Sequence, residues 1–217
     1  SDYQFKETTK ALIRANHFIS PTDIQREVIP FAMKGKDIVA ISPTGTGKTH
    51  AFLIALMEHV DPTLNYTQAV ITAPTRELAL QLYERAKIMQ EVDPRLQVRL
   101  ISGGLEKSRM NEGLKIQPHV IIGTPGRIHD LFLKEQTLLL QNVSLLVVDE
   151  ADMTLEFGFL QDIDAVASRM RKNLQMLSFS ATIPEGLKPF LKKYMHDPIT
   201  VRITSDQRFQ PQIEHVL

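Results

Sequence analysis

The predicted fold is organised around the stretch Ser42-Pro43-Thr44-Gly45-Thr46-Gly47-Lys48-Thr49. A short apolar run at residues 37–41 precedes it, and a strongly apolar run without glycine or proline follows at residues 51–57. This order predicts a strand, a glycine-rich loop and a helix, which together place backbone N–H groups around a phosphate at the helix N-terminus. A glycine-rich surface turn before a core helix is the alternative interpretation.

The residue types of this loop suit phosphate binding. Gly45 and Gly47 let the backbone turn tightly and approach an anion closely. Lys48 can reach the β- and γ-phosphates of a nucleotide, and the Thr49 hydroxyl can ligate Mg²⁺. Ser42 stands where the pattern G-x-x-x-x-G-K-[ST] has its first glycine. The loop therefore predicts a nucleoside triphosphate site.

Composition bounds the class of protein. The chain has 217 residues, which is enough for one large domain or two small ones. It has no cysteine, which excludes disulfides, thiolate metal sites and cysteine nucleophiles and favours a reducing, cytoplasmic location. No apolar run has the length of a membrane span. Because 25 basic residues balance 25 acidic ones, any nucleic-acid site must be a local feature.

After the glycine loop, short apolar runs alternate with helical patterns. The expected helices include residues 77–89 and 160–170, and two more are expected before the loop, the second ending at Gly35. The alternation predicts an α/β domain with a mainly parallel sheet that is covered by helices on both faces. Ligands of such sheets bind at the carboxyl ends of the strands. The expected later strands are residues 69–73, 98–101, 120–123, 145–148, 176–179 and 199–201.

An acidic stretch, Asp149-Glu150-Ala151-Asp152, directly follows the apolar run at residues 145–148. Carboxylates at the end of a buried strand are costly unless something needs them. Asp149 would hold a nucleotide-bound Mg²⁺, and Glu150 would orient or deprotonate the attacking water. The alternative is that both residues favour the N-terminus of the next helix.

Three further stretches follow expected strands and offer small residues, hydroxyls or free amides, twice with an arginine. Such groups hold a nucleic-acid backbone without reading its bases. Capped turns with solvated arginines are the alternative. The candidate residues are Pro74, Thr75 and Arg76; Gly103 and Gly104; and Thr124, Pro125, Gly126 and Arg127.

The stretch Ser180-Ala181-Thr182 follows another expected strand. Its two hydroxyls are expected to bind Asp152 and to link the nucleotide site to its surroundings. An ordinary helix cap is the alternative.

Taken in order, these motifs resemble the series of the DEAD-box RNA helicases. The resemblance runs from about Phe18 to Thr182, and PTDIQ at residues 21–25 resembles the Q motif that precedes the series. The matching stretches are SPTGTGKT, PTREL, GG, TPGR, DEAD and SAT. His17, Ser42 and Met153 differ from the residues usual at their motif positions.

The resemblance implies a RecA-like domain that binds ATP and Mg²⁺ and contacts RNA. Gln25 would read the adenine edge, Lys48, Asp149 and Glu150 would be catalytic, and Thr49 with Asp149 would bind the metal. The GG, PTR and TPGR residues would line the RNA path, and Asp152, Ser180 and Thr182 would couple hydrolysis to strand separation. The implied nucleotide-binding residues are Phe18, Thr22, Gln25, Thr44, Gly45, Thr46, Gly47, Lys48 and Thr49.

The resemblance also implies a division of the chain. Residues 1–204 would form the N-terminal RecA-like domain, with the Q motif at about residues 17–25, and residues 205–217 would begin a linker to a second RecA-like domain. The chain, expected to be a monomer, shows no second motif set and no HRIGR-like sequence. Because an arginine finger would lie on the second domain, we expect nucleotide binding with very slow hydrolysis.

Three other functions compete with an RNA helicase. An ATP-gated RNA clamp would use the same motifs without unwinding, and strand displacement would separate the two. A P-loop ATPase acting on DNA or protein would not depend on the ribose 2′-OH. A small-molecule kinase would need an acceptor pocket that the sequence does not indicate.

Overall fold

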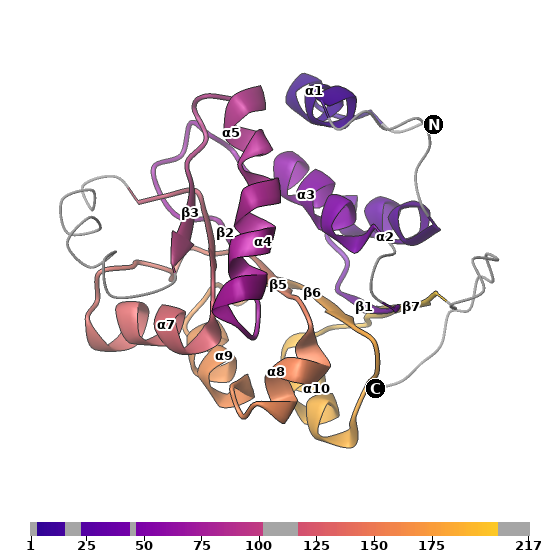
Figure 1. Ribbon diagram of the computed structural model, residues 1–217, viewed down its shortest axis with the longest axis vertical. Coiled ribbons are helices and arrows are strands. Elements are labelled where there is room, and N and C mark those ends of the chain that lie inside the picture. Colours follow the sequence, from indigo (N-terminus) through magenta and orange to yellow (C-terminus); the bar gives the residue numbers. More distant parts are fainter. Residues whose placement is uncertain (1–3, 16–22, 44–46, 102–116, 204–217) are drawn as a thin grey trace.

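The computed structural model describes residues 4–15, 23–43, 47–101 and 117–203. Its centre is a seven-stranded sheet with the order β3-β4-β2-β5-β6-β1-β7, and all six neighbouring pairs are parallel. The predicted α/β fold is therefore confirmed, with a fully parallel sheet (Figure 1). The strands are β1 Ile38–Ile41, β2 Ala69–Thr72, β3 Val98–Ile101, β4 Val120–Gly123, β5 Leu145–Val148, β6 Gln175–Ser180 and β7 Ile199–Arg202.

Helices cover both faces of the sheet, as Figure 1 shows. One layer holds α1 Glu7–Ala15, α2 Asp23–Met33, α3 Lys48–His59, α4 Arg76–Ala86 and α5 Ile88–Val92. The other holds α7 Pro125–His129, η1 Asp130–Lys134, α8 Ala151–Glu156, α9 Leu160–Ala167, η2 Glu185–Leu187 and α10 Lys188–Tyr194.

Strand residues alternate between the two layers, because successive side chains of a strand point to opposite faces. Ile38 and Ala40 of β1 join the core under α1 to α5, whereas Val39 and Ile41 join the core under α7 to α10. All four are buried. Burial on both faces explains why these strands are continuously apolar in sequence.

Two expected helices end earlier than predicted. The run predicted at residues 77–89 is divided at Lys87, where the Gln90 N–H bonds to the Lys87 carbonyl and tightens the turn. The run predicted at 160–170 ends at Ala167, because the Met170 N–H bonds to the carbonyl three residues back. Both helices were predicted from their apolar pattern, which continues through a tightened turn.

The motifs that follow β1, β2, β4, β5 and β6 share the carboxyl edge of the sheet, because all strands are parallel. The strand order places β5 and β6 between β2 and β1. The acidic stretch after β5 and the hydroxyls at the end of β6 therefore lie between the glycine loop and the stretch after β2. This arrangement brings the predicted site residues to one edge.

Candidate nucleotide and nucleic-acid site

The centre of the site is Lys48, the first residue of α3, which pairs with both carboxylates at the end of β5. Its Nζ lies 3.0 Å from Asp149 Oδ1 and donates a hydrogen bond to Glu150 Oε1. The Lys48, Asp149 and Glu150 side chains are 14%, 5% and 12% exposed, so the ion pairs are largely shielded from water. The structure thus joins the predicted phosphate-binding lysine to the predicted acidic pair.

Burial decides the charge balance of this cluster. Desolvation raises the pKa of Asp149, because a buried carboxylate loses its hydration, while the charge of Lys48 opposes this increase. Desolvation also acts to lower the pKa of Lys48, but Asp149 and Glu150 outweigh it and raise that pKa. The two carboxylates therefore stabilise the ammonium form of Lys48. The ionised form of Asp149, in turn, is stabilised by the positive charge of Lys48.

The backbone at Glu150 is unusual for a residue with a side chain. Glu150 has φ 52° and ψ 52°, in the left-handed region. It precedes α8 without a side-chain cap hydrogen bond, and its side chain turns to Lys48 instead. Its carbonyl accepts hydrogen bonds from the Thr154 N–H at 3.0 Å and the Thr154 hydroxyl at 3.1 Å. The Glu150 side chain thus faces Lys48, while its carbonyl accepts the first hydrogen bonds of α8.

The glycine loop is held at its end by α2. Gly47 has φ 83°, a conformation that favours glycine, and α3 begins directly after it. The Gln25 side chain, only 2% exposed, donates from Nε2 to the Gly47 carbonyl at 3.2 Å. The Thr49 hydroxyl belongs to a buried residue at the same helix start. Gln25 is therefore in contact with the end of the glycine loop.

A cavity of about 220 Å³ opens beside Lys48. Gly47, Lys48, Thr49, Asp149 and Glu150 line one side, and the second wall comes from α4. The wall residues Leu78, Gln81, Leu82 and Arg85 were not identified from the sequence. In the sequence, the only indication was that these residues lie three to four positions apart and so share one face of a helix. Without knowledge of the cavity, such spacing is interpreted as core packing.

The stretch at the end of β6 is linked to the acidic stretch by one side chain. The Thr182 hydroxyl and N–H donate to Asp152 Oδ2 at 2.9 and 3.1 Å. The expected second link was wrong: Ser180 is 2% exposed, and its hydroxyl has no hydrogen-bond partner within the described residues. Ser180 ends strand β6, so its side chain is buried beneath the sheet edge instead of reaching Asp152.

The predicted RNA-binding stretches open helices at the same edge. Thr75 caps α4, since its hydroxyl accepts the Leu78 N–H at 3.2 Å, and Arg76 beside it is exposed. Thr124 precedes α7 without a side-chain cap bond. The buried Nε of Arg127 has no hydrogen-bond partner among the described residues. Pro74 and Pro125 are buried, so little of either ring is accessible to a ligand.

Gly123 and Gly126 have different surroundings. A Cβ on Gly123 would lie 2.6 Å from the Ile101 carbonyl oxygen, so β3 approaches too closely for a side chain. A Cβ on Gly126 would meet only Asp162 Oδ2, at 3.7 Å. Gly126 thus has room for a side chain, whereas Gly123 is required by packing.

Several predicted site residues lie outside the described residues: Phe18, Thr22, Thr44, Gly45, Thr46, Gly103 and Gly104. In the described part of the chain, no helix is long and apolar enough to cross a membrane. The same part contains no group of three or more histidine, aspartate or glutamate residues placed to hold a metal ion.

Comparison with known proteins agrees with this geometry. The family model described as "DEAD/DEAH box helicase" matches residues 22–190. The DEAD-box ATP-dependent RNA helicase CshB of Bacillus subtilis is 48% identical over 220 residues, which cover 99% of this chain and 50% of the relative. CshA of Bacillus cereus is 40% identical over 199 residues, which cover 91% of this chain and 37% of that relative.

Solved structures show the same fold. A DEAD box protein from Methanococcus jannaschii matches with a TM-score of 0.84 and 34% identity, over 93% of this chain and 55% of that one. The dbp5 protein of S. cerevisiae, solved with nup159, gle1, IP6 and ADP, matches with a TM-score of 0.83 and 29% identity, over 93% of this chain and 53% of that one. These matches confirm the predicted RecA-like fold.

A parallel sheet with a lysine-bearing glycine loop after one strand and an acidic pair after another defines the P-loop class of domains. Within this class, the chain belongs to the DEAD/DEAH box helicase family. It spans about half the length of the curated CshB relatives that it matches.

Proposed function

We propose that this chain is the N-terminal ATP-binding domain of an ATP-dependent RNA helicase of the cytoplasm, active with a second RecA-like domain. The observation that carries the proposal is the pairing of Lys48 with Asp149 and Glu150 beside an open cavity. Phosphoryl transfer depends on positioning and charge stabilisation, and these groups supply both. The proposal is also supported by relatives named ATP-dependent RNA helicases.

The donor set fits a nucleotide-bound Mg²⁺. The buried Asp149 carboxylate has a raised pKa, so a cation nearby would favour its ionised form. Thr49, a buried residue at the start of α3, offers its hydroxyl. Mg²⁺ commonly takes few protein ligands and fills its remaining positions with phosphate oxygens and water. When bound, the ion would neutralise charge on the phosphates.

Each residue of the centre then has a distinct task. Lys48 would leave Glu150 to bind a phosphate, because phosphate oxygens and the carboxylate compete for the same ammonium group. The released Glu150 would orient the attacking water and accept its proton. Gln25 would read the adenine edge, and its hydrogen bond to the Gly47 carbonyl would position the end of the glycine loop.

RNA would bind at the same edge through its backbone. Arg76 and Arg127 would contact phosphates, and Gly126 would let the RNA approach the N–H groups near the start of α7. The Thr182–Asp152 hydrogen bonds would link this edge to the hydrolytic centre, because Asp152 is two residues from Glu150. ATP hydrolysis and RNA binding would therefore be coupled through these bonds.

The test is ATP hydrolysis by a protein that joins this chain to its second RecA-like domain. We expect stimulation by single-stranded RNA and not by DNA of the same sequence, because backbone contacts would involve the 2′-OH. Glu150→Gln should retain ATP binding and lose turnover. Equal stimulation by DNA would contradict the RNA assignment, and ATP-dependent RNA retention without strand displacement would favour a clamp.

The 217-residue chain alone permits a simpler test. It should bind ATP with Mg²⁺ in calorimetry and turn it over very slowly, because the expected arginine finger belongs to the second domain. Lys48→Ala should weaken binding at least tenfold, since a charge-assisted phosphate contact contributes about 1.5–3 kcal/mol. Brisk RNA-stimulated hydrolysis by this chain alone would contradict the assignment of the finger.

A further inference from the structure

We infer that the amino edge of the sheet, opposite the nucleotide site, is a second surface that binds the phosphate backbone of duplex RNA. We call this surface the basic edge. It lies on the turn between α2 and β1 and on the turn between α9 and β6. Its exposed basic side chains are Lys34, Lys36, Arg169, Arg171 and Lys172.

The two turns lie side by side because β1 and β6 are neighbouring parallel strands. Gln175, the first residue of β6, ties them together: its Nε2 donates to the Ala32 carbonyl at 3.0 Å and to the Lys36 carbonyl at 2.9 Å. Asp37 adds a second tie, because its carboxylate accepts the Met176 N–H at 2.8 Å. Neighbouring strands are about 4.8 Å apart, so cations from both turns can contact one nucleic-acid backbone.

The cations of the basic edge have no carboxylate partner among the described residues. Within the described part of the chain, none of the five forms an ion pair with a carboxylate. Nearby, Asp37 is buried, and its carboxylate accepts hydrogen bonds from two backbone N–H groups. Asp164 pairs with Lys193, and Asp197 is an exposed acid in the turn before β7. For a chain of zero formal charge, this excess of positive charge is local.

Positive charges near this edge act on His59, a half-buried histidine at the end of α3. Burial lowers the pKa of His59, and the charges of Lys6 and Arg171 lower it further. Arg171 itself is directed by Tyr66, since its guanidinium lies 5.6 Å from the ring centroid and its Nη2 lies 3.4 Å from the hydroxyl. Positive charges from two distant parts of the chain, Lys6 and Arg171, therefore act on the same histidine.

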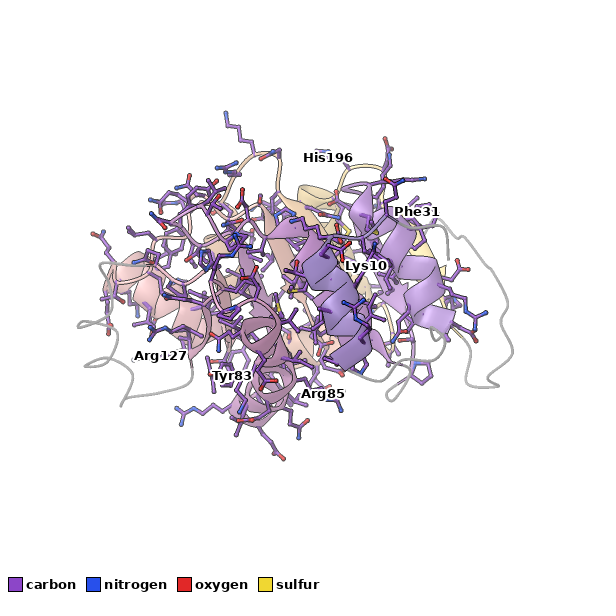
Figure 2. All side chains as sticks on the ribbon, turned by 90° about the horizontal axis from the view of Figure 1, so that it is seen from above. Lys10, Phe31, Tyr83, Arg85, Arg127 and His196 are labelled. Atoms are coloured by element: carbon purple, nitrogen blue, oxygen red, sulfur yellow. The ribbon has the colours of Figure 1, made fainter. Side chains whose placement is uncertain are left out.

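The chemistry of the surface favours phosphates over bases. Neither turn carries an exposed large hydrophobic side chain, so the surface lacks the aromatic platform on which single-stranded bases stack. Exposed lysines and arginines contact phosphates and contribute a binding energy that depends strongly on salt. The N–H of His196, in the turn before β7, bonds to Asp37 beside the basic edge. In Figure 2, His196 lies far from Arg127 at the proposed RNA site. The basic edge would therefore hold a different part of the RNA.

The inference rests on the proposed RNA substrate, because the duplex would be a flank of the strand bound at the carboxyl edge. An acidic protein could use the same cations. RNA is favoured because its phosphates are regularly spaced along a rigid helix, whereas nothing on this surface offers the apolar centre of a protein interface.

The test uses two variants of the 217-residue chain with equal net charge. The basic-edge variant carries Lys34→Gln, Lys36→Gln, Arg169→Gln and Lys172→Gln, and keeps Arg171 because of its contact with Tyr66. The control variant carries Lys10→Gln, Lys87→Gln, Lys134→Gln and Lys188→Gln, which lie on other elements and each face a carboxylate. Fluorescence anisotropy with a short blunt RNA duplex, without nucleotide, gives Kd over a salt series.

We expect the basic-edge variant to bind at least tenfold more weakly, with a slope of log K against log salt that is shallower by about 3. The control should change the slope by less than about 1. Equal behaviour of the two variants overturns the inference, and so does tighter binding of a polyglutamate peptide than of the duplex. If the fourfold variant melts early, the Lys34→Gln/Lys172→Gln pair should shift the slope by about 2.

A further variant separates this inference from the proposed function. Arg127→Gln should weaken ATP-dependent binding of single-stranded RNA and change the salt slope of duplex binding without nucleotide by no more than about 1. If Arg127→Gln changes nothing while the basic-edge variant loses duplex binding, the proposed RNA site fails and the basic edge stands. The reverse result overturns the basic edge alone.

Discussion

Two glycines in one short motif should respond in opposite ways to the same substitution. Gly123 ends β4, and a Cβ there would lie 2.6 Å from the Ile101 carbonyl oxygen and 3.3 Å from Ile128 Cγ1. Gly126 lies in α7, where a Cβ would meet only Asp162 Oδ2 at 3.7 Å. Gly123→Ala therefore tests packing, and Gly126→Ala tests access to the backbone.

The magnitudes follow from these contacts. Relieving a contact of 2.6 Å requires a shift of roughly 0.6 Å between β3 and β4, and overpacking of this kind costs about 1–3 kcal/mol. The same shift strains the hydrogen bond from the Ala73 N–H to the Gly123 carbonyl, at 3.1 Å. Gly126→Ala instead gains up to about 1 kcal/mol of helix propensity. For a chain of this size, 1 kcal/mol corresponds to about 2–4 °C in Tm.

The assay pairs thermal unfolding, followed by circular dichroism, with anisotropy of labelled single-stranded RNA. Gly123→Ala should lower Tm by several degrees. Gly126→Ala should keep or raise Tm and weaken RNA binding in the presence of ATP, because its methyl group would stand between the phosphate and the backbone. A Gly123→Ala variant with unchanged Tm would refute the packing argument. Unchanged RNA affinity of Gly126→Ala would refute its role in RNA binding.

Four further outcomes follow from the structure. Glu150→Gln in the two-domain protein should retain ATP binding and lower turnover at least about 100-fold, measured in a single-turnover ATPase assay. A double-mutant cycle of Asp152→Ala and Thr182→Ala should give a coupling of about 0.5–1.5 kcal/mol in urea unfolding. Asp37→Ala should lower the free energy of unfolding by about 2–5 kcal/mol, because the Met176 and His196 N–H groups both lose their acceptor. Because the pKa of folded His59 is lowered below 6.5, its contribution to stability is full above pH 6.5 and declines as the pH falls below that value. His59→Gln should flatten this decline in urea midpoints measured between about pH 7.5 and 5.5.

The sequence predicted those site residues whose type and position in a motif indicate a single chemical role. Lys48 after two glycines, and Asp149 after an apolar strand, could be assigned to the same edge because parallel strands end together. Their contact in the structure confirms that the two motifs lie together. The competing interpretation, an acidic helix start, accounts for the position of Glu150 at the N-cap of α8. It does not account for the Glu150 side chain, which contacts Lys48 and makes no cap bond.

The sequence did not predict features that depend on contacts between distant elements. Gln81 and Arg85 follow an ordinary helical pattern, and only the position of α4 beside α3 turns them toward the cavity. Ser180 and Thr182 both carry hydroxyls at the end of β6, next to the strand that Asp152 follows. Only the Thr182 hydroxyl bonds to Asp152. Whether a side chain points out of a strand end or into it depends on where the strand stops, and sequence patterns place such boundaries poorly.

Glu150 shows why the geometry of the centre follows from tertiary structure. A left-handed conformation costs a residue with a side chain on the order of 1 kcal/mol or more, so local sequence preference opposes it. The conformation persists because both the N–H and the hydroxyl of buried Thr154 bond to the Glu150 carbonyl, while Lys48 holds its carboxylate. Thr154→Val would remove one of these bonds at nearly constant volume. The strain at Glu150 is thus balanced from α8 and α3 together, and a phosphate that displaces Lys48 from Glu150 would remove one of the two restraints.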